Sequence, residues 1–290
     1  MSLLYRIAPP LGAIVALAAL ALTPSPAVAQ DNDQDDQDEW LQDCRHDDYG
    51  WGRRHRRYRH CEIRESGIKA PGGTLRVDPG RNGGVGIRAW DRDSIHIVAK
   101  IQVQAGNEAD AERIAQSIRV VTSGGTIRAE GPRSYEDDES WSVTFEVYAP
   151  EKTDLDLSTE NGPLSVTGIT GSMSLATQNG PLTLHGVAGD VKARVRNGPL
   201  SVVLGGDHWS GTGLDAETVN GPVVLAIPSG YSAKLETGTV NGPMTVDFPI
   251  TVTFMGHLSQ RLNTTLGSGG APVRVVTTNG PLVIRRRGRI

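Results

Sequence analysis

The second half of the chain alternates apolar and polar residues on both sides of a recurring tripeptide, Asn-Gly-Pro. After the first copy, for example, Leu164 and Val166 are apolar while Ser165 between them is polar. Alternation with a period of two is typical of strands that bury one face. Each copy therefore predicts a corner between two short strands. The six copies begin at Asn161, Asn179, Asn197, Asn220, Asn241 and Asn279.

Two all-β architectures fit these repeats. In a hairpin array or sandwich, Asn-Gly forms tight turns between antiparallel strands, but the Pro that follows has no N–H to donate to the strand ladder. In a β-solenoid (β-helix), the tripeptide is a corner and each repeat pairs with its neighbours in the stack. The repeats favour the β-solenoid. We expect its six Asn side chains to form a hydrogen-bonded ladder, as identical amides do in stacked strands.

Charged residues occupy outward positions of the predicted strands. Stacking the repeats in chain order places Lys192 beside Asp215 and Arg194 beside Glu217. Opposite charges on neighbouring strands attract each other. This face is either a solvated surface of mixed charge or a binding strip. In the second case Lys192, Arg194 and Arg196 are the candidates for contacting an anionic ligand.

The N-terminus has the features of a secretory signal peptide. Arg6 precedes an apolar run from Leu11 to Leu22, and Ala27-Val28-Ala29 is a small-x-small cleavage site. We expect export to the periplasm or cell surface, or secretion, with a mature chain from Gln30. No later run is apolar and long enough to predict a transmembrane segment. The acidic stretch Asp31–Glu39 is too polar to bury a core, so we expect it to be disordered.

Two cysteines, Cys44 and Cys61, flank a segment rich in arginine and histidine. In an exported chain they predict a disulfide. The cationic segment either binds phosphates, acidic glycans or anionic lipid headgroups, or neutralises the acidic stretch before it. Its histidines match no standard zinc spacing. The candidate anion-binding residues of this head are Arg53, Arg54, Arg56, Arg57 and Arg59.

The middle of the chain is again β in pattern, with one exception. Residues 107–118 place Ala111, Ile114, Ala115 and Ile118 on one helical face, and Asn107 is suited to the N-cap. We therefore expect one short helix there. The predicted regions are a signal peptide (1–29), an acidic tail with the Arg-rich head (30–66), a β-rich N-terminal part (67–150) and the repeat solenoid (151–290).

Composition narrows the function classes. A net charge of −4 and a pI near 6.0 disfavour nucleic acid as a partner. The sequence holds no nucleophile elbow, phosphate loop or metal-ligand motif, so we predict no catalytic residue, metal or cofactor. The alternative is a β-helix enzyme acting on polysaccharide, which needs two carboxylates at a suitable separation. Stacking in chain order offers Asp215 and Glu236 as such a pair.

Several segments together resemble a known family. These are Cys61-Glu62-Ile63-Arg64-Glu65, Gly86-Ile87-Arg88-Ala89-Trp90-Asp91, the Val-Tyr-Ala-Pro junction at 147–150 and the Asn-Gly-Pro-Leu-x-Val repeats. The chain resembles the bacterial adhesin-like family of β-strand-repeat proteins, which is related to an auto-transporter adhesin head domain. The resemblance covers residues 75–290 and implies an exported β-solenoid without assigned catalytic residues.

The resemblance, the predicted export and the lack of a reactive cluster in the sequence together favour a non-catalytic envelope protein. Its partner would be an envelope polysaccharide, an anionic lipid or another protein. A docking partner in an envelope stress-response system is a further alternative.

Overall fold

The computed structural model describes residues 26–46, 58–132, 139–247 and 260–287. The chain divides into two compact units, residues 1–40 and 41–290. The predicted signal sequence up to residue 25 and the head residues 47–57 lie outside the described residues. Helix α1 (Pro26–His46) begins in the first unit, and its last residues belong to the second.

Helix α1 corrects two expectations, because the acidic stretch is helical and the described chain has two helices rather than one. The helix begins at Pro26, a residue suited to the first helical position, and no glycine or further proline interrupts it. Its last turn is covalently held, since Cys44 is bonded to Cys61. The polarity of the stretch excluded a buried core but did not exclude a helix.

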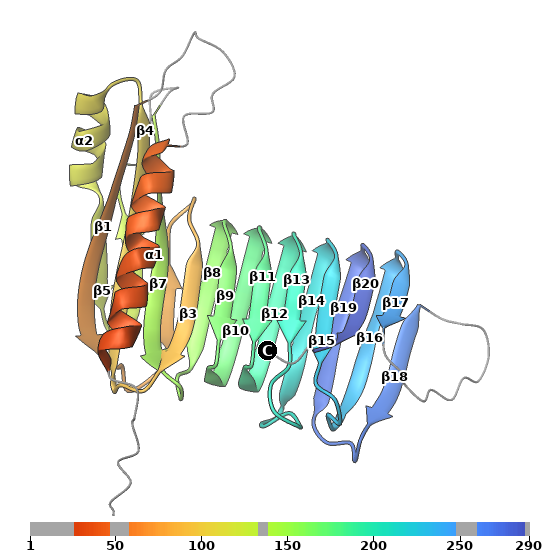
Figure 1. Cartoon of the computed structure of the whole chain (residues 1–290). Helices are drawn as coiled ribbons and strands as arrows, with labels where there is room; N and C mark the ends of the chain where they lie inside the picture. Colours follow the sequence, from red (N-terminus) through yellow and green to blue (C-terminus); the bar gives the residue numbers. More distant parts are fainter. Residues whose placement is uncertain (1–25, 47–57, 133–138, 248–259, 288–290) are drawn as a thin grey trace, which may run out of the picture. The chain divides into compact units, whose positions relative to one another are not determined.

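The second unit is mostly β, with two sheets of ten described strands each (Figure 1). Sheet A has the order β1 (Tyr58–Lys69), β4 (Ser94–Ala105), β7 (Ser140–Pro150), β3 (Val85–Trp90), β9 (Leu164–Thr167), β11 (Leu182–His185), β13 (Leu200–Val203), β15 (Val223–Ile227), β20 (Leu282–Arg286) and β17 (Met244–Asp247). Sheet B has the order β18 (Arg261–Leu266), β16 (Ala233–Asn241), β19 (Pro272–Asn279), β14 (Gly213–Asn220), β12 (Ala188–Asn197), β10 (Thr170–Asn179), β8 (Leu155–Asn161), β2 (Leu75–Asp78), β6 (Thr126–Glu130) and β5 (Arg119–Ser123).

Each Asn-Gly-Pro copy joins a strand of sheet B to a strand of sheet A. In the first copy, β8 precedes the tripeptide and β9 follows it. The same strands of successive copies pair in parallel and in register, so that Asn161, Asn179 and Asn197 are neighbours. A hairpin array is wrong for these repeats, because the strands on either side of each corner lie in different sheets. Antiparallel pairs occur only towards the ends of the described sheets, as in β1–β4–β7, β5–β6 and β16–β18.

The core lies between the sheets. The inward residues of the first repeat, Leu155 and Leu157 in β8 and Leu164 and Val166 in β9, are at most 1% exposed. Helix α2 (Glu108–Ser117) adds to the same core from the N-terminal part of the unit. The Asn107 side chain caps it by accepting from the Asp110 amide. Its buried face consists of the predicted residues Ala111, Ile114, Ala115 and Ile118.

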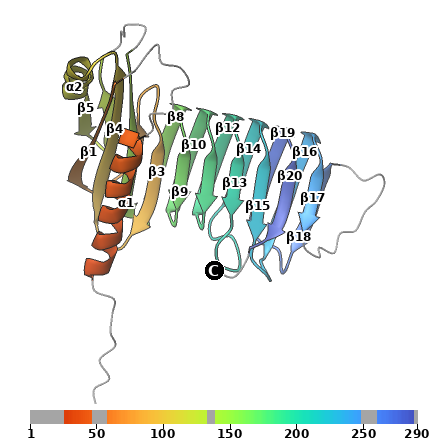
Figure 2. The same cartoon turned by 45° about the horizontal axis from the view of Figure 1, so that its top comes forward.

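The last two repeats depart from chain order. The sixth repeat, β19–β20, lies between the fourth, β14–β15, and the fifth, β16–β17. Figures 1 and 2 show β19 between β14 and β16. Charge favours this order: stacking the fifth repeat directly on the fourth would put Asp215 beside Glu236, whereas the insertion places Arg274 between them.

Candidate functional site

The Asn-Gly-Pro corners are built around a ladder of side-chain amides. From Asn161 onwards, each amide nitrogen donates to the amide oxygen of the preceding rung at 2.8–3.1 Å. The ladder runs across the sheet from Asn82 to Asn241, because the sixth repeat stands before the fifth. Asn82 was not among the predicted ladder residues, although it too precedes a glycine. In order, the ladder is Asn82, Asn161, Asn179, Asn197, Asn220, Asn279 and Asn241.

The glycine of each repeat, and the threonine that five of the six repeats carry two residues before the asparagine, are explained by different contacts. A Cβ on Gly198 would lie 2.1 Å from the carbonyl oxygen of Gly180, and one on Gly221 would lie 2.0 Å from that of Gly198. No side chain fits at these stacked corners. The buried Thr218 hydroxyl donates to the Gly198 carbonyl at 2.9 Å and satisfies it. The stacked corners therefore hold the strands of sheet B in register, and with them the outward side chains.

Those side chains include a charged network across four adjacent strands, which consists of Arg194, Asp215, Glu217, Arg274 and Glu236. Arg194 on β12 bridges Asp215 at 2.6 Å and Glu217 at 2.9 Å. Arg274 on β19 bridges the same two carboxylates at 2.6 and 3.1 Å and also reaches Glu236 at 3.5 Å. The two arginines therefore hold three carboxylates in place.

The network sets the charge state of Asp215. Partial burial alone would raise the pKa of this carboxyl, but hydrogen bonds and charge from Arg194 and Arg274 outweigh it, so its pKa lies below the usual value. A carboxyl in this state is a poor proton donor at neutral pH, since general acids need a raised pKa.

The carboxylate pair of the enzyme alternative is wrong in its placement. Asp215 and Glu236 are not on neighbouring strands, because β19 lies between β14 and β16. Arg274 occupies the position between them and forms ion pairs with both. The prediction failed because it assumed that repeats stack in chain order.

The structure places the predicted cationic residues of the strip in different roles. Lys192 aligns with Asp215 and Arg194 with Glu217 in the β12–β14 register. Arg194 belongs to the charged network. Lys192 and Arg196 are exposed on the same strand, and within the described ranges neither forms an ion pair. Arg196 also lines the first of the two hollows on this face.

Two adjoining hollows lie on the outer face of sheet B, and together we call them the transverse groove. The first, of about 330 Å³, is lined by Ala176, Gln178, Arg194 and Arg196 among others. The second, of about 190 Å³, is lined by Gly238, Val240, Arg261, Val276 and Thr278 among others. They share Glu217 and Val219, so the groove crosses the strands from β8 to β18.

Apolar side chains in this groove are unusually exposed. Val219 is 42% exposed and Val240 is 51% exposed, and both line its second hollow. The other exposed large hydrophobic residues of the described chain are Tyr58 and Val246. In earlier repeats the same position before Asn holds Glu160, Gln178 and Arg196. The change from polar residues to valine at this position is visible in the sequence. Which residues surround these valines depends on the order in which the repeats stack.

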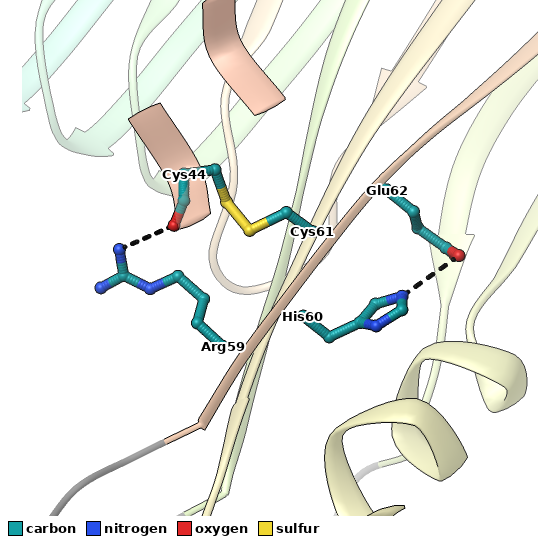
Figure 3. Close-up of a disulfide and its surroundings, with 5 residues drawn as sticks. All are labelled: Cys44, Arg59, His60, Cys61 and Glu62. Carbon is teal, nitrogen blue, oxygen red and sulfur yellow. Dashed lines mark hydrogen bonds and ion pairs between the residues drawn. A yellow bond between two sulfur atoms is a disulfide. The ribbon is translucent and has the colours of Figure 1, made fainter. Parts of the chain in front are cut away.

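The Arg-rich head is described only in part (Figure 3). Arg53, Arg54, Arg56 and Arg57 lie outside the described residues. The predicted disulfide is present, with Cys44 and Cys61 Cα atoms 6.3 Å apart. Arg59 donates to the Cys44 carbonyl at 3.2 Å, which suits the C-terminal end of a helix. Among the described residues, no group of three His, Cys, Asp or Glu side chains is placed to hold a metal.

The three described tryptophans of the β unit, Trp90, Trp141 and Trp209, do not form an extended platform for sugar rings. Trp141 and Trp209 donate to backbone carbonyls of Pro132 and Gly189. Trp90 belongs to a cluster on sheet A with His96 and Tyr148, whose ring centroids are 5.8–6.1 Å apart. The Arg92 guanidinium also lies over the Trp90 ring, 4.9 Å from its centroid.

Comparisons with known proteins give distant structural similarities. No family model matches the chain, and no curated protein matches it. A candidate cell adhesion protein from Clostridium sporogenes is similar with a TM-score of 0.39 and 12% identity, over 79% of this chain and 100% of that one. A candidate adhesin from Bacteroides fragilis has a TM-score of 0.29 and 11% identity, over 79% and 97%. A candidate lipid-binding protein from Parabacteroides distasonis has a TM-score of 0.27 and 11% identity, over 79% and 97%.

These values are too low to transfer a function. Within the described residues, no helix has the length and apolar character needed to span a bilayer.

Proposed function

We propose that this chain is an exported, non-catalytic, adhesin-like protein of the cell envelope that binds an extended anionic ligand in the transverse groove. The observation that carries the proposal is the groove itself, where exposed valines adjoin an exposed arginine without an ion-pair partner in the described chain. Apolar patches rimmed by polar residues are typical of interaction sites on soluble proteins.

The repeat half suits an extended ligand. We propose that it is a β-solenoid, supported by the parallel, in-register pairing of successive repeats and by their alternation between two sheets. Such stacks offer long regular faces. The groove runs across the strands, so one linear molecule can contact several repeats at once.

The charges favour an anionic ligand. The charged network neutralises most of its own charge, whereas Lys192 and Arg196 lie outside it on β12. An acidic envelope polysaccharide meets these requirements, because its carboxylates can pair with the cations and its ring faces can cover the valines. None of the described residues that line the groove is aromatic, so charge and apolar contact rather than ring stacking would give the affinity.

Export is supported by the signal-peptide features of residues 1–29 and by the disulfide. Disulfides persist in oxidising compartments such as the periplasm and the cell exterior. In such a location an envelope polymer is an accessible partner.

The test is co-sedimentation of the mature chain, residues 30–290, with the fractionated envelope of the producing organism. We expect retention by one fraction, weakening as salt rises from about 0.05 to 0.5 M because screening shortens the range of charge attraction. The double variant Arg196→Ala with Val219→Ser should weaken retention about tenfold, as loss of one charge contact and one apolar contact costs about 1.4 kcal/mol or more.

Arg119→Ala is the matched control, since Arg119 is exposed on β5 at the other edge of the described sheet B. Equal loss of retention in both variants would contradict a groove-specific site. No retention by any fraction would overturn polymer binding and favour a protein partner, sought by crosslinking in cells.

A further inference from the structure

The insertion of β19–β20 defines a slot within the repeat stack. Its walls are the fourth repeat on one side and the fifth on the other. Both walls belong to chain that precedes β19 in sequence, so they are synthesised before the strand that lies between them. In every other pair of stacked repeats, each repeat follows its neighbour in chain order.

The slot has a specific chemistry. Its walls present three carboxylates, Asp215, Glu217 and Glu236, and β19 supplies Arg274 to all of them. Without that arginine, like charges would face each other across the stack. The ladder has a matching requirement, because Asn279 donates to Asn220 and accepts from Asn241, each at 2.8 Å.

The buried contacts between the inserted repeat and the walls of the slot are also specific. Val275 and Ile284 of the inserted repeat are fully buried. The hydroxyl of Thr237 in one wall donates to the Val275 carbonyl at 2.6 Å. The slot is therefore a site for a two-strand segment with arginine, buried apolar residues and the Asn-Gly-Pro corner at fixed positions.

The connection to the inserted strands permits exchange. β18 is joined to β19 through Gly267-Ser268-Gly269-Gly270-Ala271, and three of these glycines have positive φ of 52°, 81° and 134°. A glycine-rich loop of this kind can act as a hinge. Exchange of an element between identical chains keeps nearly all contacts and changes only the hinge, which makes it a low-cost route to dimers.

We propose that the slot also accepts β19–β20 of a second copy of this chain, which yields a strand-exchanged dimer. The second copy brings the same arginine, asparagine and apolar residues into the same positions. The window for exchange is the interval in folding when the walls have formed and the slot is empty. This assembly does not depend on the proposed ligand.

The test uses the mature chain in two separately tagged batches. One carries Val224→Cys on β15 and the other Val283→Cys on β20, because these residues are direct partners across the slot. The batches are unfolded together in urea at high concentration, with the native disulfide intact, and refolded. We expect a mixed disulfide between the two tags, at about tenfold the yield of a control, because neighbouring strands are within disulfide reach.

The control replaces Val224→Cys by Thr183→Cys. Thr183 lies in the same row of sheet A on β11 but is not adjacent to β20. A single chain carrying both Val224→Cys and Val283→Cys should form the bond internally in the monomer, which verifies that the substitutions fold. A mixed disulfide no more abundant than in the control, with only monomers in native mass spectrometry, would overturn the proposal.

Discussion

At the residue scale, each part of the repeated corner has its own physical cause. The asparagine extends an amide ladder, the glycine lies against the carbonyl of the adjacent rung, and the threonine two residues before the asparagine donates to a glycine carbonyl, as at Asn220, Gly221 and Thr218. The proline has no N–H, and its carbonyl accepts from the next rung, as in the 2.9 Å bond from Leu182 to Pro199. The tripeptide recurs along the chain because each of its residues makes a contact that stacking requires.

Substituting a corner glycine should therefore be severe. Gly198→Ala would place its Cβ 2.1 Å from the Gly180 carbonyl oxygen, so the corner must move. We expect a loss of about 3 kcal/mol in the free energy of unfolding, the upper end for overpacked sites. Urea unfolding measures it. Gly73→Ala is the control, because nothing lies within 4 Å of its added Cβ, and equal effects at both positions would contradict the stacking argument.

The amide ladder predicts that an asparagine in its middle contributes more to stability than an asparagine at its end. Asn197 makes two ladder bonds and Asn241 makes one. At roughly 0.5–1 kcal/mol per surface hydrogen bond, Asn197→Ala should lower the unfolding free energy about twice as much as Asn241→Ala. Thermal and urea unfolding of both variants provide the comparison. A larger loss at Asn241 would show that the ladder contributes little.

The charged network predicts a pH dependence. The folded-state pKa of Asp215 is lowered, so its contribution is present above the unfolded value near 3.9 and is lost as pH falls through the lower folded value. Asp215→Asn should thus reduce stability at pH 7 by up to about 1 kcal/mol, because the site is partly exposed.

The gap between wild type and Asp215→Asn should narrow below about pH 4. Urea midpoints at several pH values measure this, with Asp190→Asn as the control, since Asp190 is exposed and forms no ion pair in the described structure. A gap that is constant with pH would contradict the role of the ion pairs.

At the element scale, the sequence pattern predicted the strands and the helix, because neighbouring residues determine where these form. Alternation predicted the strands around each corner, and apolar spacing together with a capping asparagine predicted α2 with its buried face. The order of the last repeats was not predictable from alternation, because every repeat offers the same apolar face. It depends on which outward charges meet, and Arg274 makes three such contacts only in the inserted position.

The candidate site, like the strands, was predicted only in part from the sequence. Arg194 and Arg196 were found from their outward positions, but only the stack revealed that Arg194 is paired while Arg196 lines the groove. Val219 and Val240 were missed, because the sequence alone does not show that a valine before Asn lines a groove formed with neighbouring strands. The helical acidic stretch was missed because charge density indicates solvation rather than backbone conformation.

The disulfide predicts a local effect on α1. It joins residues 17 apart, and closing a loop of this size stabilises a fold by about 3 kcal/mol in the chain-entropy account. Cys44→Ser with Cys61→Ser should speed proteolysis of the helix end and lower the melting temperature. Limited proteolysis read by mass spectrometry, with the repeat half intact in both proteins, measures this. Unchanged cleavage of residues 41–46 would contradict the prediction.

At the scale of the whole molecule, the second unit combines a rigid scaffold with a variable outer face. Apolar residues between the sheets and the stacked corners fix the strands. The outward residues are free of that constraint, and along sheet B they change from polar residues to a charged network and exposed valines. This separation of scaffold from surface is the basis of the proposed binding role.

The measurement that tests this role most directly is methyl NMR of valine-labelled mature chain, titrated with the envelope fraction that retains it. We expect shifts of the Val219 and Val240 methyl groups, which line the groove, with little change at Val246, another exposed valine, on β17 of sheet A. Shifts at Val246 without shifts at Val219 and Val240 would contradict binding in the transverse groove.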